Sequence, residues 1–215
     1  MNPWLDTVLV LLILTNLYML GSSRISACIR AVAIQAMLLG MTSLLAQWGN
    51  VGLRLLLLAI VSTAIKAGLL PWLLRRAVRE VGAQTEVEPL VGFTTSLLLG
   101  LGLLGAALHV AGLLLPLPGD AGTRFPVAVA LFTIMVGLLL IVSRRKAVMQ
   151  TLGYLAMEKG IYAFGLAFAV EEPLLVEMGV LLDVFVAVFV MGIAIHHISR
   201  EFDHIDTDRL SALKD

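Results

Sequence analysis

The stretch RRKAVMQTLGYLAMEKGIYAFGLAFAV, residues 144–170, decides the fold class, because three basic residues precede an apolar run with Glu158 near its centre. The run from Ala147 to Val170 can cross a bilayer as a helix, since a hydrocarbon core of about 30 Å needs about 20 apolar residues. A charge at mid-depth costs at least about 2.5 kcal/mol on insertion scales, so such a residue is usually buried in a bundle and functional. The stretch therefore predicts a transmembrane helix that carries a functional ionisable group.

The rest of the chain has the same character. Its 215 residues are 60% hydrophobic and 14% charged, with a mean hydropathy of +0.99, whereas a soluble domain has about 25% charged residues. The apolar runs are continuous rather than alternating, which excludes a transmembrane β-barrel. We therefore predict an all-α, polytopic membrane protein. The single cysteine, Cys28, excludes a disulfide and a cysteine-rich metal or iron–sulfur site within this chain, so we expect no redox site or cofactor here.

Turn signals and charged residues divide the chain into seven predicted transmembrane helices. The first starts without a basic segment before it, so we read it as a retained helix and not as a signal peptide. The predicted spans are Trp4–Leu20, Ala31–Trp48, Leu55–Leu74, Leu90–Leu115, Phe125–Val142, Ala147–Val170 and Pro173–Ile195.

The distribution of lysine and arginine predicts the orientation. With seven spans, eleven of these residues lie on one side of the membrane and two, Arg54 and Arg124, on the other. Basic residues favour the cytoplasmic side, so we predict an external N-terminus and a cytoplasmic C-terminus. We divide the chain into a four-helix segment (1–122), a three-helix module (123–200) and a cytoplasmic tail (201–215).

Three ionisable residues are predicted to share one plane near the bilayer centre. Lys66 lies about 16 Å into its helix at 1.5 Å per residue, and Glu158 and Asp183 lie at similar depths. Glu177 is on the same helix as Asp183 but nearer the outer face. Lys159 neighbours Glu158 and points about 100° away from it. We interpret these residues as a proton or ion path, with a purely structural ion pair between Lys66 and one of the acids as the alternative.

Other polar or small residues in the spans have simpler readings. We expect His109 to be a hydrogen-bonded packing residue and His196, His197 and His204 to be interfacial rather than metal ligands. The glycines of the fourth span are expected to permit close helix contacts, since a phosphate loop needs a strand before it. They are Gly100, Gly102, Gly105 and Gly112.

The last three spans resemble the K subunit of bacterial complex I and the C subunit of Mrp-type sodium/proton antiporters. The resemblance rests on the basic turn 144–146, the sequence LGYLAME at 152–158, a mid-membrane acid in the next helix and the HIDT sequence at 204–207. In those families a glutamate stands in each of the second and third helices. Here the first acid, Glu158, lies one helical turn after the position of the family's first glutamate, and the second acid is an aspartate, Asp183.

The whole chain resembles the E subunit of hydrogenase-4, from the membrane arm of energy-converting group 4 [NiFe] hydrogenases. The matching sequences are TAIK at 63–66, GYLAME at 153–158, LVEMG at 175–179 and LSALK at 210–214. The resemblance implies a non-catalytic membrane-arm subunit of a complex I-related oxidoreductase that couples electron transfer to proton translocation.

The same resemblance implies partners and a location. We expect antiporter-like and H-like membrane subunits, a hydrophilic hydrogenase arm that holds Ni–Fe and Fe–S centres, and a bacterial or archaeal cytoplasmic membrane. Nothing in the chain suggests a nucleic acid as partner. The alternative function is a subunit of a multisubunit cation/proton antiporter without a redox arm, and a standalone seven-helix transporter or receptor is a third reading.

Overall fold

The computed structural model describes residues 3–46, 60, 63–80, 90–114 and 121–167, and its regular elements are all helical. The all-α prediction is therefore confirmed for this part of the chain. The predicted seventh span, Pro173–Ile195, and the C-terminal tail lie outside the described residues. The elements are α1 (Pro3–Gly21), α2 (Ile25–Ala46), the π-helix η1 (Ile65–Leu69), α4 (Leu70–Glu80), α5 (Phe93–Leu114), α6 (Ala121–Ser143) and α7 (Ala147–Ala167).

Several of these helices are suited to a bilayer. Within the described residues, three segments are long and apolar enough to cross it: Trp4–Gly21, Phe93–Leu114 and Arg124–Ser143. The apolar helix Ile25–Met41 is shorter. The architecture is that of a helical membrane protein.

Two helix boundaries differ most from the sequence prediction. Helix α2 begins at Ile25 rather than at Ala31, and α4 continues to Glu80 although the polar break was predicted to begin at Arg75. Hydropathy marks only the apolar part of a span, whereas the helical backbone can extend into polar residues that reach water. Arginine, alanine and glutamate are good helix formers, which is why α4 continues through its charged end.

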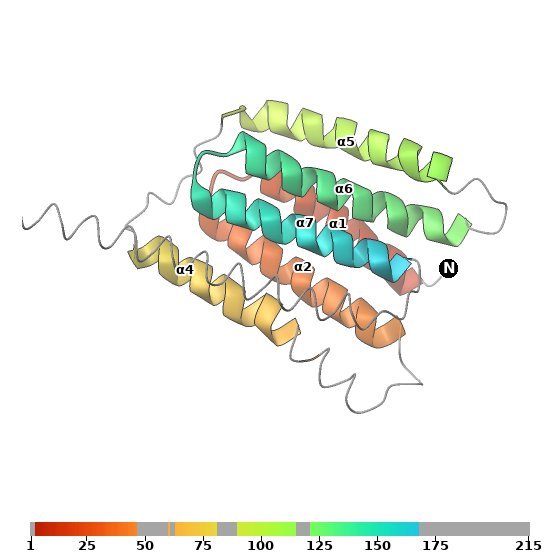
Figure 1. Cartoon of the computed structure of the whole chain (residues 1–215), viewed down its shortest axis with the longest axis horizontal. Helices are drawn as coiled ribbons and strands as arrows, with labels where there is room; N and C mark the ends of the chain where they lie inside the picture. The colour runs from red at the N-terminus through yellow and green to blue at the C-terminus, as the bar shows by residue number, and fades with distance from the viewer. Residues whose placement is uncertain (1–2, 47–59, 61–62, 81–89, 115–120, 168–215) are drawn as a thin grey trace, which may run out of the picture.

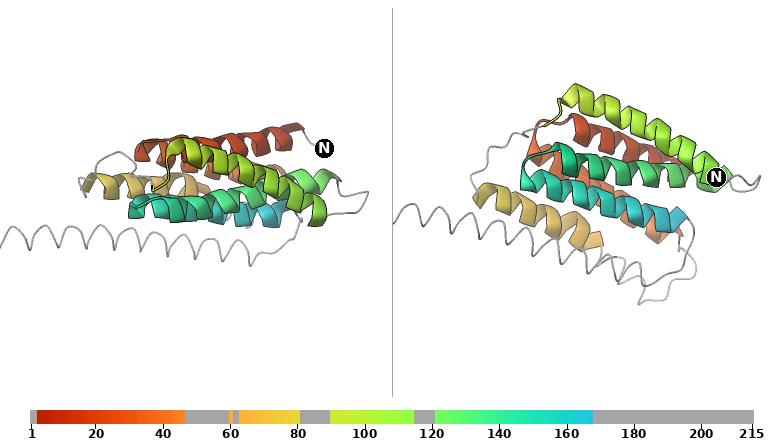
Figure 2. Two further views of the ribbon diagram at one scale, coloured as in Figure 1. Left: turned by 90° about the horizontal axis from the view of Figure 1, so that it is seen from above. Right: turned by 45° about the horizontal axis from the view of Figure 1, so that its top comes forward.

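The helices form one elongated bundle (Figure 1). The turns from α1 to α2 and from α6 to α7 lie at one end of the bundle, while the N-terminal end of α1 lies at the other. Helices α2 and α7 both start at the end that holds the turns, so they run in the same direction. Two further views show α5 on the outside of the bundle, beside α1 and α6 (Figure 2).

Helices α6 and α7 form the closest packed pair. A Cβ atom on Gly137 would lie 2.6 Å from the carbonyl oxygen of Gly153, and one on Gly160 would lie 2.7 Å from the backbone nitrogen of Ile134. The two backbones are therefore in direct contact, as is typical of membrane helices that meet through small residues. This contact fixes the position of α7, the helix that carries Glu158 and Lys159.

The glycines of α5 were predicted to permit close contacts, and the structure supports this for only one of the four. A Cβ on Gly100 would lie 2.5 Å from Leu20 of α1, whereas a Cβ on Gly102, Gly105 or Gly112 would meet no atom of the described residues within 4 Å. The prediction is wrong for these three, because they lie on the outward side of a peripheral helix.

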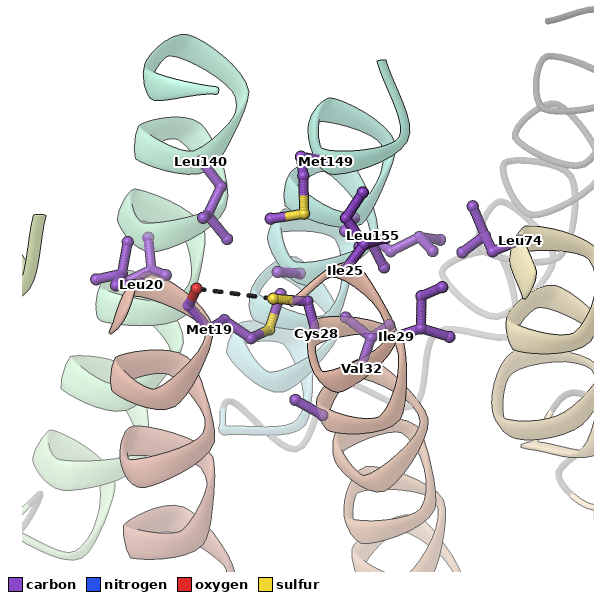
Figure 3. Close-up of a cluster of buried hydrophobic side chains, with 14 of the residues drawn as sticks. Met19, Leu20, Ile25, Cys28, Ile29, Val32, Leu74, Leu140, Met149 and Leu155 are labelled. Carbon is purple, nitrogen blue, oxygen red and sulfur yellow. Dashed lines mark hydrogen bonds between the residues drawn. The ribbon is translucent and has the colours of Figure 1, made fainter. Parts of the chain in front are cut away.

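The largest hydrophobic cluster joins α1, α2, α4, α6 and α7 (Figure 3). Ile25, Ile29 and Val32 of α2 share it with Leu155 of α7, and Leu74 of α4 packs against the same cluster. The cluster fills the end of the bundle near the turns. The cluster also fixes the position of α2 along α7, so the heights of the polar residues that follow it on each helix can be compared.

Candidate functional site

Lys66 and Glu158 form an ion pair inside the bundle. The Nζ atom of Lys66, on η1, donates a hydrogen bond to Oε1 of Glu158 on α7. The side chains are 16% and 6% exposed, respectively. Two residues that were predicted from sequence to share a plane are thus brought into direct contact, and each charge has its counterion.

The backbone around Lys66 is unusual. Residues Ile65–Leu69 form a π-helix, in which the N–H of Leu70 donates to the carbonyl oxygen of Ile65. Such segments are rare and often occur at functional sites. Here the wider turn lies within the element that holds the buried ammonium group.

An aromatic ring completes the surroundings of Lys66. Its Nζ atom lies 5.7 Å from the ring centroid of Tyr162, which follows Glu158 by one helical turn on α7. An ammonium over an aromatic face is attracted by the ring quadrupole, more strongly where water is excluded. Helix α7 therefore stabilises the cation with two side chains on the same face.

Lys159 is buried on a different side of α7. It is 4% exposed, and its Nζ atom donates to the carbonyl oxygen of Leu155 at 3.3 Å. This bond to the preceding turn shortens the reach of the side chain and keeps the ammonium at mid-helix. The role of Lys159 in a path stays a prediction.

The remaining predicted residues have mixed outcomes. Asp183, Glu177 and the C-terminal histidines (196, 197 and 204) lie outside the described residues. His109 was expected to be a packing residue, but it is exposed on α5. That prediction is wrong because α5 is peripheral and turns this position away from its neighbours.

A cluster of uncharged polar residues was missed by the sequence analysis. Asn16 donates from Nδ2 to Oγ1 of Thr133 at 2.8 Å, and Gln35 donates from Nε2 to Oδ1 of Asn16 at 2.8 Å and to Oγ1 of Thr15 at 3.1 Å. Asn16 and Gln35 are fully buried. The cluster joins α1, α2 and α6, and its only signal in the sequence is an amide inside each of two apolar helices.

Arg144 was also missed, because it was counted among the basic residues of the cytoplasmic turn. Its side chain is fully buried, its Nη2 atom donates to the carbonyl oxygen of Leu20 at 2.8 Å, and its guanidinium lies 5.1 Å from the ring centroid of Phe93. Burial lowers the pKa of this guanidinium, which nevertheless stays charged near neutral pH. The negative ends of the α1 and α6 dipoles, which meet beside it, favour the cation.

The described residues thus offer proton-exchanging groups rather than metal ligands. Among them there is no group of three or more histidine, cysteine, aspartate or glutamate side chains that could hold a metal ion. What the site contains is an acid, two amines and a hydrogen-bonded amide cluster at mid-bundle. Such a set can hold and exchange protons, and it can orient water.

Comparison with known proteins shows the family of this chain. The "Uncharacterized protein Rv0085" of Mycobacterium tuberculosis is 34% identical over 206 residues, which cover 95% of this chain and 93% of that protein. The chain belongs to the same family as Rv0085. It is also 39% identical to hydrogenase-4 component E of Escherichia coli over 98 residues, with the same value for the protein of Shigella flexneri.

The match to hydrogenase-4 component E covers 46% of this chain and 45% of that protein. Residues 125–215 match the family described as NADH-ubiquinone/plastoquinone oxidoreductase chain 4L. The recognition of a hydrogenase-4 E-like chain with a K-subunit-like C-terminal part is therefore confirmed. No solved structure matches significantly. The part of this chain that resembles a membrane subunit of the complex I-related type is residues 125–215, which include Glu158 but not Lys66.

Proposed function

We propose that this chain is a non-catalytic membrane-arm subunit of a hydrogenase-4-like oxidoreductase and contributes buried charges to proton translocation driven by electron transfer. The observation that carries the proposal is the ion pair between Lys66 and Glu158 inside an apolar bundle. Burying two charges costs several kcal/mol per ion, and well-packed apolar residues often stabilise a bundle equally well. A pair kept at mid-membrane is therefore better explained by function than by stability.

The proposed mechanism is a change of countercharge. A carboxylate in a water-poor bundle keeps its charge while an ammonium faces it, and it takes up a proton when that ammonium moves away or is neutralised. In this scheme Glu158 exchanges the proton and Lys66 is the movable countercharge. Lys159, in the same layer, would pass the electrostatic change to the next group. The π-helical turn at Lys66 gives this lysine a backbone that differs from a regular helix.

Asp183 and Glu177 complete the proposed path. The predicted topology of seven helices, with the N-terminus outside and the C-terminus in the cytoplasm, would put Asp183 level with Glu158 and Glu177 nearer the outer surface. The path would then connect mid-membrane charges to one side of the cytoplasmic membrane of a bacterium or archaeon.

The partners follow from the same proposal. Antiporter-like and H-like membrane subunits would flank this chain, and a hydrophilic arm would hold the Ni–Fe and Fe–S centres. The similarity to hydrogenase-4 component E supports this assembly. The alternative is a subunit of a cation/proton antiporter without a redox arm, and the gene neighbourhood distinguishes the two, since only the first predicts an adjacent Ni–Fe large subunit.

The direct test is purification of the tagged chain from its native membrane, with identification of the subunits that accompany it. We expect membrane subunits of the antiporter-like and H-like types together with redox subunits. Antiporter subunits without any redox subunit would favour the alternative. A monomer that transports a solute alone in liposomes would contradict both.

A further inference from the structure

The amide of Gln35 is held in one orientation by the polar cluster. Its Nε2 atom donates to both Asn16 and Thr15, and Asn16 in turn donates to Thr133, whose hydroxyl donates to the carbonyl oxygen of Val129 at 2.7 Å. Each hydrogen bond therefore points from α2 towards α1 and α6. Because only the nitrogen of an amide can donate, Nε2 makes both of these bonds and the oxygen of Gln35 makes neither.

That oxygen has an unused capacity to accept hydrogen bonds. Gln35 is fully buried, and within the described part of the chain its Oε1 atom has no hydrogen-bond partner. A buried carbonyl without a donor costs about 1–3 kcal/mol, and native proteins usually satisfy such groups with protein or water. We therefore expect a hydrogen-bond donor next to Oε1 of Gln35.

Helix packing places Gln35 and Lys159 at similar heights in the bundle. Val32 of α2 and Leu155 of α7 belong to the same hydrophobic cluster, and the two helices run in the same direction (Figures 1 and 3). Gln35 follows Val32 by three residues and Lys159 follows Leu155 by four, so each lies one helical turn beyond the cluster. From the starts of their helices, Ile25 and Ala147, the two lie at depths of about 15 and 18 Å.

A second contact places Gln35 level with Lys66. A Cβ on Gly40, late in α2, would lie 2.5 Å from Oγ1 of Thr63, which precedes Lys66. Ile29, early in α2, belongs to the same hydrophobic cluster as Leu74, which follows Lys66. These contacts make α2 antiparallel to the segment that carries Lys66. Gln35 then lies within about 3 Å of the height of Lys66.

We propose that Gln35 binds a buried water molecule that also hydrogen-bonds to Lys159, so that Gln35, Asn16 and Thr133 form a hydrated branch of the charged layer. Water suits this position because it can donate to Oε1 of Gln35 and accept from the Lys159 ammonium, and a buried water typically makes about three hydrogen bonds. The branch extends the layer from η1 and α7 to helices α1, α2 and α6. It rests in part on the proposed function, since a path needs mobile or exchangeable water beside its charges.

The structural test is a cryo-electron microscopy map of the intact complex at a resolution that shows ordered water. We expect density within hydrogen-bond distance of Oε1 of Gln35 and Nζ of Lys159, and we expect it to be absent from the Gln35→Met variant. Methionine has a similar length but cannot accept this bond strongly. A protein group that fills the position, or density that persists in Gln35→Met, would overturn the proposal.

A functional measurement separates this inference from the proposed function. In proteoliposomes of the purified complex, Gln35→Met should reduce the number of protons taken up per electron, whereas Gln35→Glu, which keeps an acceptor, should retain more of it. Thr151→Val is the matched control, because Thr151 is buried on α7 and its hydroxyl donates to Ala147 of the same helix.

The two possible failures are distinguishable. Normal proton uptake in Gln35→Met, when Glu158→Gln is impaired, would refute the branch and leave the proposed function standing. Normal uptake in Glu158→Gln would refute the proposed function, while the density at Gln35 would still decide whether water binds there.

Discussion

Lys66 and Glu158 are 92 residues apart in the sequence and meet as an ion pair between η1 and α7. Because Lys66 lies outside the part of the chain that matches the chain 4L family and Glu158 lies inside it, the pair joins the N-terminal helices to the K-subunit-like module. The contact gives the N-terminal helices a direct electrostatic influence on the acid of that module.

The first prediction concerns the acids of the path. Glu158→Gln and Asp183→Asn should leave the complex assembled but reduce its coupling of electron transfer to proton movement, because each change keeps the side-chain size and removes a titrating charge. Glu177→Gln should have a smaller effect, since Glu177 is predicted to lie nearer the outer face. Protons taken up per electron in proteoliposomes is the measurement, with subunit content as the control. Normal coupling in both mid-membrane variants would make this chain a scaffold.

The second prediction concerns the lysine of the pair. Lys66→Met should destabilise the subunit by about 3–5 kcal/mol, because it leaves a buried carboxylate without its counterion. The double variant Lys66→Met with Glu158→Gln should recover most of that loss, since no buried charge then remains unpaired. Thermal unfolding in detergent measures both. If the double variant is as unstable as the sum of the single changes, the two residues are not coupled in the way that the structure indicates.

The third prediction tests the contact between α6 and α7. Gly137→Ala should destabilise the bundle by about 1–3 kcal/mol, because the new methyl group meets the backbone of α7 and forces the helices apart. Gly105→Ala on α5 is the matched control, because no atom in the described part of the chain lies within 4 Å of its added Cβ. The comparison is the midpoint of thermal unfolding of the two variants. Equal midpoints would argue against direct backbone contact at Gly137.

The fourth prediction concerns topology. After replacement of Cys28, single cysteines introduced between α5 and α6, at residues 116–120, should react with a membrane-impermeant thiol reagent added from outside. A cysteine in place of Arg145 should react only from the cytoplasmic side, because the basic turn is predicted to lie there. Arg145 is exposed, unlike its neighbour Arg144, which makes it the better position to label. Labelling of Arg145→Cys from outside would contradict the predicted orientation.

Much of the fold could be predicted because membrane helices have a simple signature. The apolar runs located α1, α5, α6 and α7 to within a few residues, since a bilayer demands a continuous apolar segment of fixed length. Boundaries in polar sequence, such as the end of α4 at Glu80, were misplaced because hydropathy does not detect the part of a helix that extends beyond the apolar region. The site was predicted in part: counting residues from each interface placed Lys66 and Glu158 at one depth.

Other parts of the site could not be predicted from sequence alone. A single amide such as Gln35 inside an apolar helix costs less than a charge, so it produces no strong signal, and its partners depend on which faces meet. Arg144 was misread because the rule for basic residues assigns a side of the membrane and not the burial of a side chain. His109 was misread for the opposite reason, since depth along a helix does not show which face is covered. Asp183 and Glu177 remain predictions.

Because Ile65–Leu69 form a π-helical turn, the direction of the Lys66 side chain depends on the number of residues in its helix as well as on their identity. Removing one residue, for example Gly68, would convert the turn to regular α-helix and rotate everything before it by about 100° relative to α4. The ammonium would then point to a different neighbour, although no charged residue had been changed. Insertions and deletions in this short segment should therefore be as consequential as substitution of the lysine itself. In related chains, a change in the length of this segment alone would change the partner of the lysine.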